Sequence, residues 1–151
     1  MATESTVKEI IQKIELESFS NKVAMDMGVR IIELAKSRNQ AIAVEISRLN
    51  HTVFLYVDDE LPADKHNWLR RKANVAKHFE ESSLAVKTTL QNRQMSLEKP
   101  FGLEEKDYIA KGGSIPVFVK NAGMVATITV SGLRDFEDHD IIIEALKGKY
   151  M

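Results

Sequence analysis

One lysine of this chain stands where a charged side chain needs a partner. Between residues 63 and 91 the apolar side chains recur at the spacing of an amphipathic helix, and Lys72 falls inside the apolar arc. At roughly 100° per residue, it lies about 40° from Trp68 and about 20° from Phe79. An ammonium group in that position needs an anion or a route to water. It therefore meets a carboxylate or phosphate of a ligand, reaches out to solvent, or pairs with an acidic side chain of the protein.

A pair of glycines opens the last hairpin of the chain, at Gly112–Gly113–Ser114. Adjacent glycines adopt positive φ and let a ligand or another part of the chain come close, and their N–H groups can face an anion or a flat ligand. The same residues also suit a plain tight turn into a strand. The motif is not a P-loop, because the glycine spacing and the following Lys-Ser or Lys-Thr pair of that motif are missing.

The histidines and the basic run 65–72 give further candidates. His139 lies on the inward face of the last predicted helix, where an imidazole could ligate a metal or haem iron, move a proton, or pack in the core. His66 and His78 lack the HExxH spacing of a zinc site. The basic run contains an aromatic residue, as RNA-binding segments do, but its charges spread around the helix and favour a solvated surface.

These residues are positioned by helix and strand patterns in the order α α β β α β β α. Two hairpins separated by a long helix predict one antiparallel sheet with helices packed on it, an α+β fold of two layers. The predicted helices cover residues 7–14, 21–37, 63–91 and 104–110 and a last segment from about 135, and the predicted strands cover 41–49, 52–57, 114–120 and 124–131.

Length and composition limit the function classes. The 151 residues predict a single domain, with N-terminal helices over 5–37 and a sheet-and-helix core over 41–147. A net charge of −1 gives no reason to expect nucleic acid or an anionic membrane as partner. The absence of cysteine excludes disulfides and thiolate metal sites. The sequence shows no secretory signal and no run of about 18 apolar residues, which favours a cytoplasmic protein.

The order and spacing of several stretches resemble the GlcG/HbpS-like family, also called the haem-degrading domain family, and in particular its uncharacterised cytoplasmic branch. The resemblance covers about residues 41–146. The stretches that carry it are HTVFLY at 51–56 with Asp58–Asp59, WLRRKANV at 68–75, GGSIPV at 112–117, GMVATITVSG at 123–132, and Glu137–Asp138–His139.

The resemblance implies a fold similar to profilin or PAS-like domains and self-association into dimers or larger rings. Some members of the family bind haem, some are fused to cobalamin-related enzymes, and many have no assigned activity. The family's Lys-Ala pair corresponds to Lys72–Ala73, and its glycine-rich turn corresponds to Gly112–Gly113–Ser114. Members often carry histidine before the glycines, where this chain has Lys111. That difference argues against haem ligation by histidine at this loop.

The leading hypothesis is a non-catalytic, homo-oligomeric domain that binds a small anionic or haem-like (tetrapyrrole) ligand in a crevice between the long helix and the glycine turn. The alternative is an oligomeric interaction scaffold without cofactor, in which Lys72 pairs with a carboxylate across an interface. An enzymatic reading is the weakest, because no catalytic constellation emerges, and neither a metal nor a cofactor can be named. The predicted site comprises Lys72, Gly112, Gly113 and Ser114, with Ser131, Asp138 and His139 closing one end.

Overall fold

The centre of the molecule is a five-stranded sheet, seen in a computed structural model that describes residues 10–151. The strands lie in the order β1-β4-β5-β2-β3, and all neighbours are antiparallel except β1 and β4, which are parallel. The antiparallel sheet expected from the two hairpins is confirmed, with one short parallel strand added at its edge. The strands are β1 (Ile14–Leu16), β2 (Ala43–Arg48), β3 (His51–Val57), β4 (Ser114–Val119) and β5 (Gly123–Ser131).

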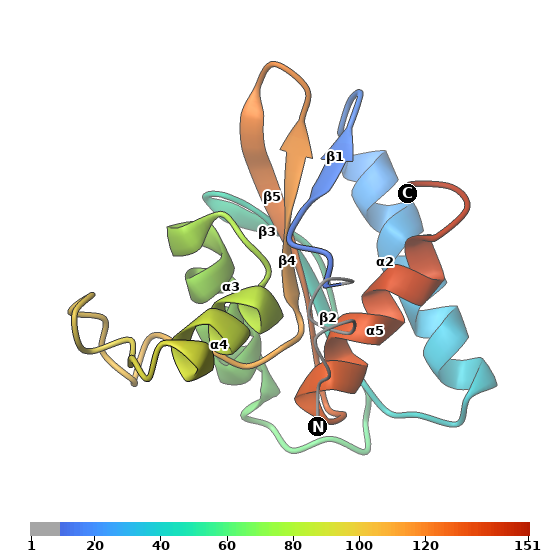
Figure 1. Ribbon diagram of the computed structural model, residues 1–151. Helices are drawn as coiled ribbons and strands as arrows, with labels where there is room; N and C mark the ends of the chain where they lie inside the picture. Colours follow the sequence, from blue (N-terminus) through green and yellow to red (C-terminus); the bar gives the residue numbers. More distant parts are fainter. Residues whose placement is uncertain (1–9) are drawn as a thin grey trace.

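Helices cover both faces of this sheet. Helices α2 (Asn21–Ser37) and α5 (Asp135–Leu146) lie against one face, and α3 (Lys65–Phe79) and α4 (Ser83–Asn92) lie against the other (Figure 1). The α+β class and the helix-flanked sheet are confirmed. The sheet is sandwiched, so the layers number three where the sequence predicted two. None of the helices described is long and apolar enough to cross a membrane.

The two faces of the sheet differ in chemistry, and β5 shows why. Its residues Ala126, Ile128 and Val130 join the apolar core beneath α2 and α5. The alternate residues Thr127 and Thr129 are also buried, but they point to the face that α3 covers. Small hydroxyl side chains on that face leave room for α3 to lie close to the sheet. Every residue of this strand from 126 onward is therefore buried, whichever face it serves.

The prediction of one long helix over residues 63–91 is wrong, because the segment forms two helices, α3 and α4. Glu80 adopts a left-handed conformation with φ of 56°, which ends α3. Ser82 then caps the new helix, since its hydroxyl accepts a hydrogen bond from the N–H of Ala85 at 3.1 Å. The Ser82–Ser83 pair was the available signal, but the apolar periodicity continued across it.

Two short predicted helices are also wrong. Residues 10–13 form no helix and Ile14 opens strand β1, while residues 7–9 of that prediction lie outside the described part of the chain. Ile14 and Leu16 are buried on either side of the exposed Glu15, a period of two that the helical spacing of the apolar residues concealed. The segment 104–110 forms a turn, not a helix.

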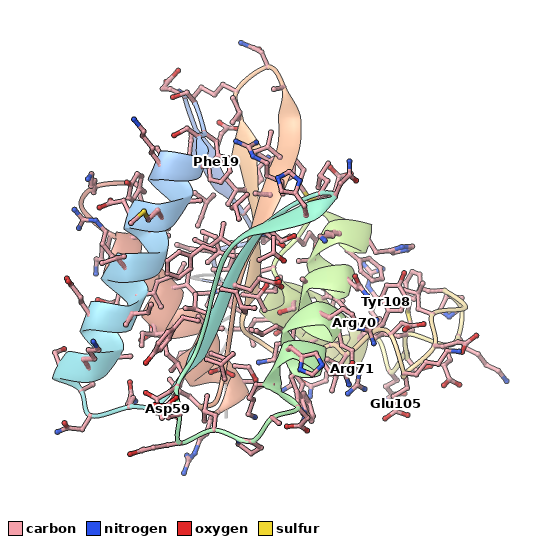
Figure 2. The ribbon with its side chains drawn as sticks, turned by 180° about the vertical axis from the view of Figure 1, so that it is seen from behind. Phe19, Asp59, Arg70, Arg71, Glu105 and Tyr108 are labelled. Carbon is pink, nitrogen blue, oxygen red and sulfur yellow. The ribbon has the colours of Figure 1, made fainter. Side chains whose placement is uncertain are left out.

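The segment 95–110 is a long loop that builds a second, smaller core with α3 and α4. Val75, Val86 and Leu90 form this core, and Met95 and Tyr108 pack against it. The loop is also tied to the outer side of α3, where side chains of the helix bond to its carbonyl oxygens (Figure 2). The loop is thus held by packing on one side and by hydrogen bonds on the other.

Candidate ligand-binding site

Lys72 forms a buried ion pair with Asp138. The ammonium Nζ lies 2.8 Å from a carboxylate oxygen of Asp138, and only 3% and 2% of the two side chains are exposed. Lys72 also donates to the carbonyl oxygen of Val130 at 3.0 Å, and the other oxygen of Asp138 accepts from the N–H of Leu133 at 3.0 Å. Of the three partners expected for Lys72, the structure contains the internal carboxylate. The pair joins α3 to the first turn of α5.

Burial acts on both members of this pair. It lowers the pKa of Lys72 from its ordinary value, although attraction to Asp138 opposes the change. Burial likewise raises the pKa of Asp138 to about 6, against the attraction of Lys72 and the hydrogen bond from Leu133. The attraction between the two groups thus opposes the effect of burial on each of them. The pair is therefore an electrostatically sensitive point at the centre of the site.

Gly112 and Gly113 allow the loop to pack against this pair. A Cβ at Gly113 would lie 2.5 Å from the carbonyl oxygen of Val130 and 2.9 Å from Nζ of Lys72, and its φ of +127° also disfavours a side chain. A Cβ at Gly112 would lie 2.3 Å from the carbonyl oxygen of Asp135. The structure shows that another part of the chain approaches this turn closely, because α5 and Lys72 occupy the space that the glycines leave.

A cavity of about 480 Å³ lies over the ion pair. Among its described lining residues, five side chains are cationic and two are acidic. Lys87 is ion-paired with Asp135, while no described carboxylate lies within 4 Å of Lys65 or Lys111. The cavity therefore has an excess of positive charge that the described residues do not neutralise. Its lining consists of Lys65, Trp68, Lys72, Lys87, Lys111, Ser131, Leu133, Arg134, Asp135 and Asp138.

Trp68, the only tryptophan of the chain, forms an aromatic wall of this cavity. The Lys65 and Lys111 amines lie 5.7 Å and 5.2 Å from the centre of its ring, and the Arg71 guanidinium lies 5.2 Å from it. Such cation–π contacts hold flexible cations near one place without neutralising them. The ring also gives the site a flat apolar surface beside its charges.

The structure brings together most of the predicted site. Lys72, Ser131 and Asp138 line the cavity, Gly113 packs against the ion pair beneath it, and Gly112 packs against the backbone of Asp135. Ser114 does not line it, since its hydroxyl bonds to that of Thr129 at 2.9 Å and its N–H donates to Ser83. His139 does not line it either.

His139 is buried beside Asp138 in sequence, with 4% of its surface exposed. Its Nδ1 has no hydrogen-bond partner among the described residues, and burial lowers its pKa to about 4. This environment agrees with His139 as a neutral imidazole packed in the core. Within residues 10–151, no group of three or more His, Asp or Glu side chains could hold a metal ion.

Sequence reasoning missed four cationic residues of the cavity. Lys87 stands at a position that no local pattern marks, and Arg134 precedes the last helix. Lys111 was noted only as the residue that replaces the family's histidine before the glycines. Lys65 belongs to the basic run that was interpreted as a solvated helix surface. Part of that run lines the cavity instead, while Arg70 bonds to Asp107 at 2.9 Å on the far side of α3. The fold alone brings these charges to one place.

Comparison with known proteins identifies the family. The model of a family described as haem-degrading, HbpS-like proteins matches residues 19–147. The chain belongs to this HbpS-like family. A UPF0303 protein of Zymomonas mobilis is 34% identical over 142 residues, which cover 94% of this chain and 76% of the relative. The resemblance drawn from the hairpin and helix stretches is thereby confirmed.

Solved structures of other proteins share the HbpS-like fold. The crystal structure of the Ybr137w protein superposes with a TM-score of 0.83 at 25% identity, over 94% of this chain and 84% of that one. A protein crystallised as a PduOC:heme complex superposes with a TM-score of 0.71 at 14% identity, over 89% of this chain and 99% of that one. At that identity the second likeness shows the fold alone.

Proposed function

We propose that this HbpS-like chain binds a small ligand through carboxylate or phosphate groups in the cavity above Lys72 and Asp138. The observation that carries the proposal is the charge of the lining, with five cationic side chains against two acidic ones around one cavity. Two of the cations, Lys65 and Lys111, are held near Trp68 by cation–π contacts and keep their charge available. An acidic ligand would complete the charge balance of the site.

The buried ion pair supports the proposal by fixing the floor of the cavity. Lys72 and Asp138 neutralise each other, so neither needs a ligand to stay buried. The pair joins α3 to α5, and the Gly112–Gly113 loop packs against both. The cations that recognise a ligand then stand on a rigid base, which lowers the entropic cost of binding.

One protein of the same fold was crystallised as a complex with haem, and the residues of this cavity fit only part of a haem molecule. The cations of the cavity suit the carboxylates at the edge of a tetrapyrrole. The described residues of its lining offer no imidazole, thioether, thiolate or phenolate, the groups that hold haem iron in proteins. His139 is buried and lies outside the lining. The proposal is therefore recognition of acidic groups, without a ligand to iron from this cavity.

The fluorescence of the single tryptophan, Trp68, provides the test. Titration with pyrophosphate and with citrate should give a saturable change, and calorimetry should give the same affinity. Lys111→Ala removes a lining charge that makes no ion pair among the described residues, and we expect about fivefold to tenfold weaker binding. Lys36→Ala removes another exposed lysine, from α2, which does not line the cavity, and should leave the affinity unchanged. Equal weakening in both variants, or no saturation with either anion, would refute the proposal.

We further propose that the chain self-associates, as the family resemblance implied. Strand β3 lies at an edge of the sheet, and Leu55 on it is 52% exposed. Unpaired strand edges with apolar side chains favour pairing with another chain. The scaffold hypothesis loses its specific support, because Lys72 finds its carboxylate within the chain and not across an interface. Sedimentation of the wild type should show an oligomer that Leu55→Glu weakens; a monomer at all concentrations would exclude self-association.

A further inference from the structure

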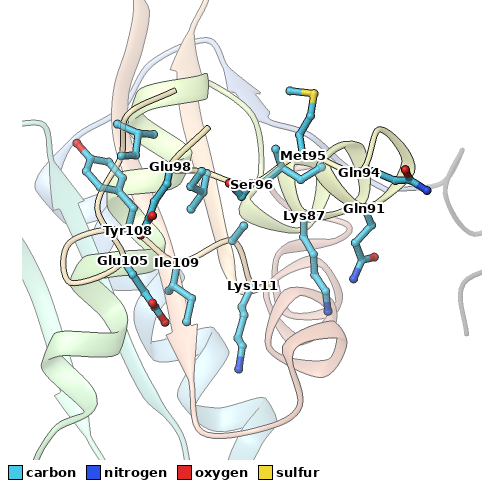
Figure 3. Close-up of a pocket in the computed structure, with 14 residues that line it drawn as sticks. Lys87, Gln91, Gln94, Met95, Ser96, Glu98, Glu105, Tyr108, Ile109 and Lys111 are labelled. Carbon is cyan, nitrogen blue, oxygen red and sulfur yellow. The ribbon is translucent and has the colours of Figure 1, made fainter. Parts of the chain in front are cut away.

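A second cavity adjoins the cationic one, and it is built from apolar side chains. It has a volume of about 490 Å³ and lies between α4 and the loop 95–110 (Figure 3). This volume falls within the usual range for small-molecule sites. Its apolar lining comprises Leu90, Met95, Leu97, Leu103, Ile109 and Ala110.

Two lysines belong to both cavities. Lys87 of α4 and Lys111, next to the glycine turn, line the apolar cavity and the cationic cavity alike. In Figure 3 both side chains extend toward the same end of the apolar cavity. A ligand in contact with these lysines therefore has charged surroundings on one side and apolar surroundings on the other.

Hydrogen bonds from α3 hold the loop that lines the apolar cavity. The Arg71 guanidinium donates two hydrogen bonds to the carbonyl oxygen of Glu105, at 2.9 and 2.6 Å. The Asn74 amide donates to the carbonyl oxygen of Asp107 at 2.8 Å. These bonds fix the loop on α3 independently of what fills the space beneath it. A preformed cavity of this kind binds small molecules more tightly than a loop that must first be ordered.

We infer that the ligand is amphipathic, with an acidic head group at Lys111, beside the Lys87–Asp135 pair, and an apolar body in the cavity beneath the loop. This inference rests on the proposed function and names its ligand class, a carboxylate with a hydrocarbon body. Glu98 and Glu105 also line the apolar cavity. Their carboxylates repel an acidic head group and Lys111 attracts it, so the side of Lys111 is the favoured position for that group.

Calorimetric titration with butyrate, decanoate and decyltrimethylammonium tests the inference below their micellar concentrations. Each buried methylene contributes a factor of about three to four in affinity, so decanoate should bind at least about 30-fold more tightly than butyrate even if only half of its additional methylenes are buried. Decyltrimethylammonium has the same apolar body with a cationic head and should bind much more weakly. Equal affinities for butyrate and decanoate, or for the two decyl compounds, would overturn the inference.

A pair of variants locates the apolar body. Ile109→Ser removes a half-buried apolar side chain from the cavity lining, and it should weaken decanoate at least about tenfold while leaving pyrophosphate binding unchanged. Val29→Ser makes a matched change on the exposed side of α2 and should alter neither. An unchanged decanoate affinity in Ile109→Ser refutes the apolar subsite. That outcome leaves the proposed function standing, because pyrophosphate binding tests the cationic cavity alone.

Discussion

Removing either member of the Lys72–Asp138 pair should destabilise the protein more than removing both. Lys72→Met leaves the carboxylate of Asp138 buried without a cation, and Asp138→Asn leaves a buried ammonium. Loss of one partner of a buried ion pair costs about 3–5 kcal/mol. In the double variant Lys72→Met/Asp138→Asn no charge remains, and the amide can still accept the hydrogen bond from Leu133.

The magnitude follows from the geometry. At 2.8 Å and an effective dielectric constant of about 20, the attraction between the two charges is about 6 kcal/mol. The desolvation of both groups offsets a large part of this attraction, as the shifts of both pKa values toward the neutral forms indicate. We therefore expect a coupling free energy of about 2–4 kcal/mol between the two positions.

Urea unfolding followed by circular dichroism at pH 7.5 measures all four proteins of this double-mutant cycle. Lys106→Met provides the control, because its pair with Glu104 is 74% and 69% exposed and should contribute less than about 0.5 kcal/mol. The reasoning is refuted if the two single changes add within about 0.5 kcal/mol, since independent effects would mean that the charges do not stabilise each other.

Three further predictions concern the same region. Burial lowers the pKa of His139 from 6.5 to about 4, so acidification from pH 7 to 4.5 destabilises the fold through this residue. Relative to the wild type, His139→Gln should therefore gain about 2–3 kcal/mol of stability over that range in urea unfolding; a pH profile identical to that of the wild type would contradict the shift. Gly113→Ala should cost more than about 3 kcal/mol, whereas Gly123→Ala, which has open space around it, should cost only about 1–2 kcal/mol for its positive φ; similar losses of thermal stability would show that the loop is not tightly packed. Ser82→Ala should cost about 1 kcal/mol through loss of the α4 cap, and an unchanged thermal midpoint would mean that the cap does not hold the break between α3 and α4.

The elements with regular local patterns could be predicted from the sequence. The helix predicted at residues 21–37 is α2, residue for residue, because a long amphipathic stripe and a polar end mark it. The inward direction of Lys72 followed from helix geometry and needed no knowledge of the fold. A close approach at the Gly112–Gly113 turn was one of the two interpretations that the conformational freedom of glycine allowed. These inferences succeeded because each depends on residues within a few positions of one another.

The remaining features depend on distant parts of the chain. Asp138 is 66 residues from Lys72, and no pattern near either residue links them. Strand β1 has three residues and exists because β4 offers it a free edge. Lys87 and Lys111 come together only because the loop 95–110 folds back over α4. Sequence reasoning identified the side chain that needed a partner, but the partner and the surrounding charges are determined by the topology.

The internal partner of Lys72 changes the role expected for that residue. The sequence suggested that it meets the acidic group of a ligand, but its ammonium already bonds to Asp138 and to the carbonyl oxygen of Val130. Recognition then falls to Lys65 and Lys111, which make no ion pair with any described carboxylate.

The two roles separate in experiment. Lys72→Met should lower the free energy of unfolding by about 3–5 kcal/mol, and the fraction that remains folded should keep most of its affinity for pyrophosphate. Lys111→Ala should do the reverse, with little loss of stability and about fivefold to tenfold weaker binding. If Lys72→Met instead abolishes binding in a folded protein, the buried ammonium contacts the ligand directly, and the ion pair must open when the ligand binds. The comparison thus decides whether the pair is the fixed base of the site or its moving part.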